Sequence, residues 1–437
     1  MAQQTAEEIA KTASAASAVL RTVSDADRVV ALQRIYAVLT THKADILAAN
    51  ELDIAEAKIT NVAGPLVKRL DLASPGKFDG MAQGVLDVAA LPDPIGKVQF
   101  KSQMDDGLEL RRVSCPIGVL LVIFESRPDV IANIAALAIK SANAVILKGG
   151  KESLHTFTAI SNLIRDALAD TKIPPGAVQL VESRQAVADL LAQDTYIDLV
   201  VPRGSNALVR SIKQSTKIPV LGHADGLCAI YINEDADADM ATKVVVDAKT
   251  NYVAGCNAVE TLLVQTSALD TVFPQVASAL IASGVELRAT PEVATTLTKL
   301  SIPFTPATPA DFDTEFLDLI IAVTSVPDVA AAIAHINMHS SKHTDSIITA
   351  SPVVAEKFLN GVDSAGVYWN ASTRFADGFR YGFGTEVGIS TSKIHARGPV
   401  GLEGLTTYQY QIRGSGQVAS EYLGAGGKKE FKHKQIV

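Results

Sequence analysis

The chain has 437 residues, of which 48% are hydrophobic and 20% are charged, and its formal net charge at pH 7 is −8. This length exceeds what one hydrophobic core supports, so the sequence predicts a globular protein of two or three domains. The negative charge repels phosphate backbones and anionic lipid surfaces, which argues against nucleic acid and membranes as partners.

Cysteine usage and the N-terminus indicate the cellular compartment. The three cysteines are far apart and odd in number, so they form no disulfide framework and fit a reducing compartment. No close group of cysteine and histidine in the sequence indicates a metal site. The first residues are polar and acidic, unlike a secretory signal, and apolar segments such as 117–124 are far shorter than the roughly 20 residues that cross a bilayer. We therefore expect a cytoplasmic protein without a bound metal.

The first hundred residues predict helices followed by a hairpin. Residues 5–90 are rich in alanine and leucine, with apolar positions at helical spacing. Residues 98–113 place Asp106-Gly107, a turn signal, between two strand-like stretches. The exposed edges of such a hairpin suit pairing with another subunit.

From Ile117 onward, short apolar runs alternate with helical stretches, which is typical of parallel sheets with helices on both faces. Ligands on such sheets bind at the carboxyl ends of the strands. The first series has expected strands at 117–124, 144–147, 177–181, 197–201 and 218–221, with helices at 128–142, 151–170, 185–192 and 205–213. The second series begins with strand 227–232, helix 237–249 and strand 260–264, and it runs to about residue 390.

Cys256 is the candidate nucleophile because its neighbours are small. Ala254, Gly255 and Ala258 allow a ligand to approach the backbone, just ahead of an apolar run that predicts a buried strand. The alternative for any single cysteine is an inert packing role. Cys228, among bulky apolar residues, fits that alternative.

Two strand-to-helix turns could hold a nucleotide. Lys148-Gly-Gly-Lys151 ends a strand with two glycines and two cations at a helix start, which suits a phosphate or ribose, although its spacing is not that of a Walker A loop. Gly204-Ser205 forms a second glycine-bearing turn. Solvated lysines and an ordinary turn are the alternatives.

Two polar segments could bind the substrate. Arg127 ends another expected strand, and its guanidinium fork suits phosphate or carboxylate. Residues 370–378 form a polar loop that ends in glycine and could line a carboxylate or amine. A surface arginine and an ordinary loop are the alternatives. His223, His339 and His343 are expected to be structural or exposed.

The order of these motifs resembles the aldehyde dehydrogenase superfamily over nearly the whole chain. The resemblance lies in Pro116-Ile-Gly-Val, Leu147-Lys148, Gly204-Ser205, Cys256 and Glu315-Phe-Leu-Asp318. Within the superfamily, the chain is similar to the gamma-glutamyl phosphate reductase family. The similar strings are Phe124-Glu-Ser-Arg-Pro, Lys148-Gly-Gly-Lys-Glu, Cys256-Asn-Ala-Val-Glu, Asn370-Ala-Ser-Thr-Arg and Gly384-Thr-Glu-Val-Gly.

The resemblance implies an α/β fold with three parts. These are a Rossmann-type NADP-binding domain in 1–225, interrupted by the hairpin 98–113; an α/β catalytic domain in 226–390, which contains Cys256; and a small β oligomerisation element from 98–113 and 391–437. It also implies reduction of L-glutamate 5-phosphate by NADPH, through a cysteinyl thioester, to L-glutamate 5-semialdehyde and phosphate. A homo-oligomer and association with glutamate 5-kinase are the expected protein partners.

The resemblance also implies roles for particular residues. Cys256 matches the nucleophile, and the backbone N–H of Cys256 or Asn257 is expected to complete the oxyanion hole. The expected cofactor residues are Lys148, Lys151, Gly204, Ser205 and Glu315. The expected substrate residues are Arg127, Asn370, Ser372, Thr373 and Arg374.

Two positions depart from the wider superfamily. Val220 stands where hydrolytic members have a glutamate that activates water, and Arg127 stands near their asparagine oxyanion donor. The first departure favours release of the acyl group to phosphate over hydrolysis. An acylating, coenzyme A-dependent enzyme or a hydrolytic aldehyde dehydrogenase of the same fold is the alternative function.

Overall fold

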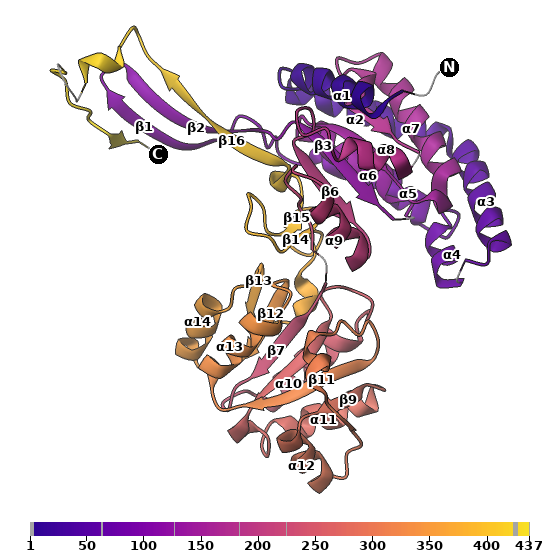
Figure 1. Ribbon diagram of the computed structural model, residues 1–437, viewed down its shortest axis with the longest axis vertical. Helices are drawn as coiled ribbons and strands as arrows, with labels where there is room; N and C mark the ends of the chain where they lie inside the picture. The colour runs from indigo at the N-terminus through magenta and orange to yellow at the C-terminus, as the bar shows by residue number, and fades with distance from the viewer. Residues whose placement is uncertain are drawn as a thin grey trace.

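The computed structural model describes residues 4–62, 64–125, 127–182, 184–223, 225–422 and 427–436. Figure 1 shows two α/β bodies and an extended β arm. The first body contains the N-terminal helices and the second contains most of the chain after residue 227. The arm projects from the first body.

The N-terminal region is helical, as predicted. Its helices are α1 (Ala6–Leu20), α2 (Asp25–Thr41), α3 (Lys43–Ile59), α4 (Gly64–Leu70) and α5 (Lys77–Ala90). Helix α1 begins with a capping box, in which the Thr5 side chain accepts from the Glu8 N–H and the Glu8 carboxylate accepts from the Thr5 N–H. Its apolar stripe is buried in the core of the first body.

A parallel four-stranded sheet forms the centre of the first body, in the order β5-β4-β3-β6. The strands are β3 (Val119–Phe124), β4 (Ala144–Lys148), β5 (Val178–Leu180) and β6 (Leu199–Arg203). The helices of this region are α6 (Val130–Lys140), α7 (Leu154–Ala169), α8 (Arg184–Leu190) and α9 (Asn206–Ser215). Every residue of β3 and β4 is buried, as the continuous apolar runs of a sheet covered on both faces require.

The prediction of a strand at 218–221 is wrong. Val220 forms only an isolated bridge with Val200. The Val200 N–H donates to the Pro219 carbonyl and the Leu221 N–H donates to the Val200 carbonyl. Pro219 has no N–H to extend this pairing, so the pairing remains a single bridge.

The second body contains a parallel seven-stranded sheet in the order β10-β9-β11-β8-β7-β12-β13. Its strands are β7 (Cys228–Ile232), β8 (Val259–Gln265), β9 (Glu286–Ala289), β10 (Thr305–Pro306), β11 (Ile320–Val326), β12 (Thr344–Ile348) and β13 (Gly366–Trp369). Its helices are α10 (Ala238–Thr250), α11 (Phe273–Ala282), α12 (Pro291–Lys299), α13 (Val329–His339) and α14 (Pro352–Gly361). The central strand β8 is fully buried.

The chain then returns to the first body and the arm. The returning strands are β14 (Gly388–Ser390), β15 (Gly398–Val400), β16 (Thr406–Arg413) and β17 (Lys434–Gln435). Strands β14 and β15 pair with each other, while β16 and β17 join β1 (Val98–Asp105) and β2 (Leu108–Pro116) in the arm, in the order β16-β2-β1-β17. All eight residues of β16 pair with β2. Within the ranges described, no helix combines the length and apolar character needed to cross a membrane.

A buried ion pair joins α10 to β8 beneath the Cys256 loop. Lys249 Nζ lies 2.6 Å from Glu260 Oε2, and both side chains are excluded from solvent. The other carboxylate oxygen, Oε1, accepts from the Leu317 N–H at 3.3 Å. Burial raises the pKa of Glu260 to about 7 and lowers the pKa of Lys249. The pair therefore connects the Cys256 loop with the segment that carries Glu315.

Replacing Lys249 with methionine should destabilise the protein by about 3–5 kcal/mol, because the Glu260 carboxylate would remain buried without its cation. The measurement is the free energy of unfolding in urea. Lys243→Met, at an exposed position of the same helix, is the matched control and should change stability by less than about 0.5 kcal/mol. Equal effects of the two substitutions would show that the buried pair contributes nothing specific.

Candidate active site

Cys256 lies in a loop between α10 and β8, at the amino end of a strand. The Gly255 N–H donates to the Tyr252 carbonyl at 3.1 Å, and the Ala258 N–H donates to the Gly255 carbonyl at 2.9 Å. These tight turns leave the Cys256 side chain half-buried. The expectation that ligands meet the carboxyl ends of strands therefore does not hold for this residue in the second sheet.

The first sheet contributes its carboxyl end instead. Arg203 ends β6 and lies close enough to Cys256 for the two charges to interact. Its guanidinium donates to the Glu386 carbonyl at 3.5 Å. Glu386 also interacts electrostatically with the Cys256 sulfur. The candidate site thus lies where the carboxyl end of one sheet meets the amino end of the other.

Gly226 fixes the backbone of the nucleophile loop. A side chain at Gly226 would overlap the Cys256 carbonyl oxygen and lie 2.5 Å from its Cα, so only glycine fits. The Glu315 carboxylate accepts a hydrogen bond from the Gly226 N–H. The Cys228 thiol donates to the Cys256 carbonyl at 3.4 Å and is buried, which confirms its predicted packing role.

The loop 370–378 packs on the other side of Cys256. Asn257 Nδ2 donates to the Ala376 carbonyl at 2.9 Å, and Thr373 Oγ1 donates to the Asn257 carbonyl at 2.7 Å. The Arg374 guanidinium lies directly over Gly255, and the Ser372 hydroxyl accepts from the Arg374 N–H at 3.3 Å. The structure therefore places four of the predicted residues, Asn257, Ser372, Thr373 and Arg374, in the loops around the nucleophile.

Asn370, which was predicted to bind substrate, makes its hydrogen bonds to the backbone of Thr349. Its Oδ1 accepts from the Thr349 N–H and its Nδ2 donates to the Thr349 carbonyl, both at 3.0 Å. Asn370 also has a positive φ of 55°, a backbone region that asparagine tolerates better than most residues. These bonds hold the start of the loop in place.

The predicted cofactor residues lie mostly at the carboxyl edge of the first sheet. Lys148 ends β4 with 8% of its surface exposed, and its ammonium donates to the Gly149 carbonyl. Lys151 is exposed at the start of the short η1 (Lys151–Ser153). At the start of α9, Glu125 Oε1 accepts from the Ser205 N–H at 2.7 Å and lies close to Gly204. The nearby Arg127 is exposed and forms an ion pair with Asp129 at 3.5 Å.

The Cys256 sulfur is a protonated thiol in this environment. Burial is the main cause that raises its pKa to about 12, and the negative charges of Glu315 and Glu386 act in the same direction. The Arg374 guanidinium and the backbone N–H of Cys256 itself lower this pKa, but not enough to offset burial and the two carboxylates. A reaction at the sulfur therefore needs further positive charge or a route for its proton.

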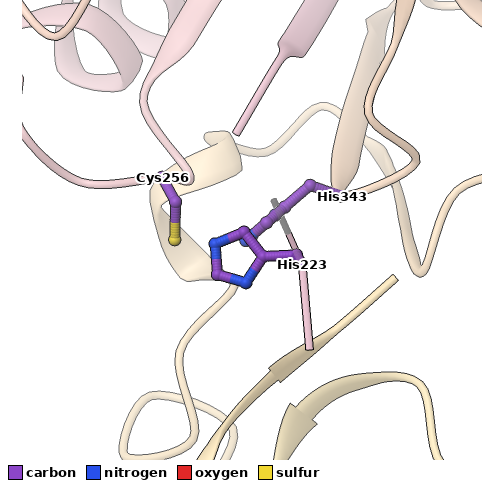
Figure 2. Close-up of side chains that lie close together, drawn as sticks. All are labelled: His223, Cys256 and His343. Atoms are coloured by element: carbon purple, nitrogen blue, oxygen red, sulfur yellow. The ribbon is translucent and has the colours of Figure 1, made fainter. Parts of the chain in front are cut away.

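Two histidines also lie beside Cys256, as Figure 2 shows. One ring nitrogen of His223, one of His343 and the Cys256 sulfur are within 4.8 Å of one another. Burial lowers the pKa of His223 and lowers that of His343 to about 3, so both imidazoles are neutral at pH 7. The expected surface role fits His339, which pairs with Asp313 at 2.9 Å.

Sequence reasoning assigned no site role to Arg203, Glu386, His223 or His343. Arg203 directly precedes the predicted Gly204-Ser205 turn, and Glu386 lies within the Gly384 string, so a signal was present for these two residues. His223 and His343 are 120 residues apart, and no spacing rule connects them with Cys256. Only the packing of three separate segments in the folded chain brings them together.

The chain is similar to known proteins over nearly its whole length. A family profile described as the aldehyde dehydrogenase family matches residues 1–296. The chain is 55% identical to the probable gamma-glutamyl phosphate reductase of Schizosaccharomyces pombe, with 98% of this chain and 97% of that protein aligned. It is 56% identical to the gamma-glutamyl phosphate reductase of Saccharomyces cerevisiae, with 98% of each chain aligned.

Solved structures confirm the predicted fold class. The crystal structure of gamma-glutamyl phosphate reductase from Thermotoga maritima has a TM-score of 0.91 and 39% identity, and the match covers 95% of this chain and 100% of that one. An acetylating aldehyde dehydrogenase from Geobacillus thermoglucosidasius shares the fold at 15% identity and a TM-score of 0.63, covering 94% of this chain and 97% of that one. The chain therefore belongs to the aldehyde dehydrogenase family of oxidoreductases and, within it, to the gamma-glutamyl phosphate reductases.

Proposed function

We propose that the protein reduces L-glutamate 5-phosphate to L-glutamate 5-semialdehyde with NADPH, the second step of proline biosynthesis, through a thioester on Cys256. The main structural observation in support is the packing of the Cys256 loop against Gly226 on one side and against the Arg374 loop on the other. Support also comes from relatives of this name that are 55% and 56% identical over 98% of the chain.

In the proposed reaction, the Cys256 thiolate attacks the acyl carbon, the carbon–sulfur bond forms, and the bond to the phosphate oxygen breaks. NADPH supplies the hydride that reduces the thioester. Collapse of the resulting thiohemiacetal releases the aldehyde and returns the electron pair to sulfur. The backbone N–H of Cys256 lies against its own sulfur, which supports the proposal that it donates to the oxyanion during these steps.

The cations around the sulfur match an anionic substrate. Arg203 and Arg374 both interact electrostatically with Cys256. A guanidinium binds phosphate or carboxylate with two parallel hydrogen bonds, so these arginines are suited to the two ends of glutamyl phosphate. Arg127 stays a candidate for the same role because its charge also acts on Arg203.

The proposed cofactor site combines Lys148, Lys151, Gly204, Ser205 and Glu315. A nearly buried ammonium at a strand end, such as Lys148, fits a ribose or phosphate oxygen. Lys151 stands near where relatives that use NAD often have a carboxylate, and a cation there suits the 2′-phosphate of NADPH. Because Glu125 already accepts from the Ser205 N–H, a phosphate at α9 would have to replace it, which makes the two lysines the stronger phosphate candidates.

Replacing Cys256 with serine should abolish reductase turnover and leave cofactor binding and folding nearly unchanged, because the change removes a nucleophile from a loop. Cys228→Ser is the matched control: it alters a buried thiol that touches the same backbone, so it should lower stability while turnover remains measurable. Steady-state rates and urea unfolding of both variants give the comparison. Substantial turnover by the Cys256 variant would exclude covalent catalysis at this residue.

Oxidation of glutamate 5-semialdehyde with NADP⁺ should depend on inorganic phosphate. Val220 stands where hydrolytic relatives have their base, and it packs against the apolar core of the first body. General-base help is commonly worth about 10²- to 10⁴-fold, so without it the thioester should await phosphate. Turnover measured in phosphate-free buffer should nearly vanish and return on adding phosphate. Steady release of glutamate, or release to coenzyme A, would identify one of the alternative enzymes instead.

The β arm is proposed to join subunits into a homo-oligomer. Tyr408, Tyr410 and Ile412 of β16 are 50%, 61% and 62% exposed, and a pocket in the arm is lined by Phe100, Leu110, Arg112 and Tyr410. Such exposed aromatic and apolar groups on an edge strand favour association. A cytoplasmic location and association with glutamate 5-kinase stay predictions of the same proposal.

Light scattering at micromolar concentration should show a dimer or larger assembly. Tyr410→Asp should shift this assembly toward monomer, because the charge would be desolvated at the interface. Met338→Asp, at a position 78% exposed on the second body, is the control and should leave the molar mass unchanged. A monomeric wild-type protein would remove the claim.

A further inference from the structure

Among the residues that the structure describes, one group of three potential metal ligands lies close together. His223 precedes β7, Cys256 precedes β8 and His343 precedes β12, so three separate segments supply one ligand each. Their ligand atoms are within 4.8 Å of one another, and Figure 2 shows the two rings beside the sulfur. The His223 and His343 rings meet edge to face, with centroids 5.3 Å apart.

Each imidazole is held through Nδ1, which leaves Nε2 toward the sulfur. His223 Nδ1 lies 3.3 Å from the Ile389 carbonyl, which can only accept, so Nδ1 carries the hydrogen. His343 Nδ1 lies 2.9 Å from the Thr344 hydroxyl and 3.9 Å from the Cys228 sulfur, and both of these groups can accept a hydrogen bond from it. Histidines that bind metals usually donate their second N–H to such a partner. These contacts suit the tautomer that a metal ligand needs, in which Nδ1 carries the hydrogen.

The Nε2 atom of His343 is the clearest sign of a missing ligand. His343 is 1% exposed, and its Nε2 is buried with no hydrogen-bond partner. A buried nitrogen lone pair without a partner is unfavourable, whereas a bound cation would satisfy it.

We propose that Cys256, His223 and His343 form a binding site for a thiophilic divalent cation, for which Zn²⁺ is the best-matched ion. One thiolate and two imidazoles are ligands that Zn²⁺ accepts, whereas Mg²⁺ and Ca²⁺ require oxygen ligands. Zinc–sulfur and zinc–nitrogen bonds of about 2.3 and 2.1 Å put tetrahedral ligands about 3.6 Å apart. The ligand atoms are now within 4.8 Å of one another, so binding requires side-chain rotations that bring them closer. Cys256 is only half-buried, so the group is not fully closed off from solvent.

Binding exchanges the thiol proton for the metal ion: the S–H bond breaks, the proton leaves to solvent, and the sulfur coordinates the cation. The functional consequence rests on the proposed function, because it requires Cys256 to be the nucleophile. The coordinated sulfur no longer attacks an acyl carbon, so the loaded enzyme is inactive. A chelator restores the free thiol and the activity.

The test is a titration of the chelator-treated protein with Co²⁺, which replaces Zn²⁺ and reports its ligands. Wild-type protein should bind one equivalent, with a thiolate-to-cobalt charge-transfer band in the near ultraviolet, and Zn²⁺ should displace it. Cys256→Ser should lose the band. His343→Gln and His223→Asn should each bind about tenfold or more weakly, because each removes one ligand.

Cys115→Ser and His339→Asn are the matched controls, since they alter a cysteine and a histidine outside the group, and both should bind Co²⁺ like wild type. Circular dichroism checks that each variant is folded. If the His343→Gln variant does not fold, Co²⁺ binding by Cys256→Ser and by His223→Asn still tests the site. An unchanged band in Cys256→Ser, or wild-type affinity in His223→Asn, would overturn the site.

A second readout separates the site from the proposed reaction. Zn²⁺ should slow alkylation of Cys256 by iodoacetamide in wild-type protein without any substrate, and mass spectrometry locates the modified residue. If Zn²⁺ protects Cys256 from alkylation but the metal-free enzyme has no reductase activity, the cation site stands and the proposed function is refuted. Full reductase activity with no protection would retain the function and refute the site.

Discussion

The contact between the backbones of Gly226 and Cys256 is the constraint on which the site depends. No side chain fits at Gly226, so the segment before β7 and the loop before β8 are held at van der Waals distance. Glu315 accepts from the Gly226 N–H, and this adds a third segment to the same contact. The sulfur is therefore positioned by backbone atoms, which move less than side chains, as a reacting atom requires.

The environment of the Cys256 sulfur favours its protonated, unreactive thiol form. Burial and two carboxylates outweigh the Arg374 cation, so the free site holds Cys256 protonated. A positively charged nicotinamide ring, or separation of Arg374 from competing anions, would shift this balance. A thiol that becomes nucleophilic only in a loaded site is also less exposed to oxidation, because the thiolate is the reactive form.

The sequence could predict what depends on neighbours along the chain. The alternating strands and helices, the small residues around Cys256 and the polar loop 370–378 all have local signals, and family strings located them. The failed strand at 218–221 shows how one residue, Pro219, ends a pairing that an apolar pattern indicates. The histidine group had no local signal, because His223 and His343 meet Cys256 only after three segments pack together.

For a related reason, the sequence could not predict that Cys256 lies at the amino end of the strands of its sheet. A rule about the carboxyl ends of strands applies to a single sheet. Here Arg203 follows the rule on the first sheet, while Cys256 lies at the opposite kind of edge on the second. Which edges face each other is decided by how the chain crosses between bodies, and no run of residues encodes that directly.

The return of the C-terminal segment to the first body has a consequence for how the chain folds during synthesis. The core of the first body includes Val387, Val400 and Leu405, and the Asn143 amide donates to the Leu405 carbonyl across 262 positions of sequence. Contacts between such distant residues form late and slow folding. The first body therefore stays incomplete while the second emerges from the ribosome, and its apolar surface needs shielding until residues 387–405 have been made.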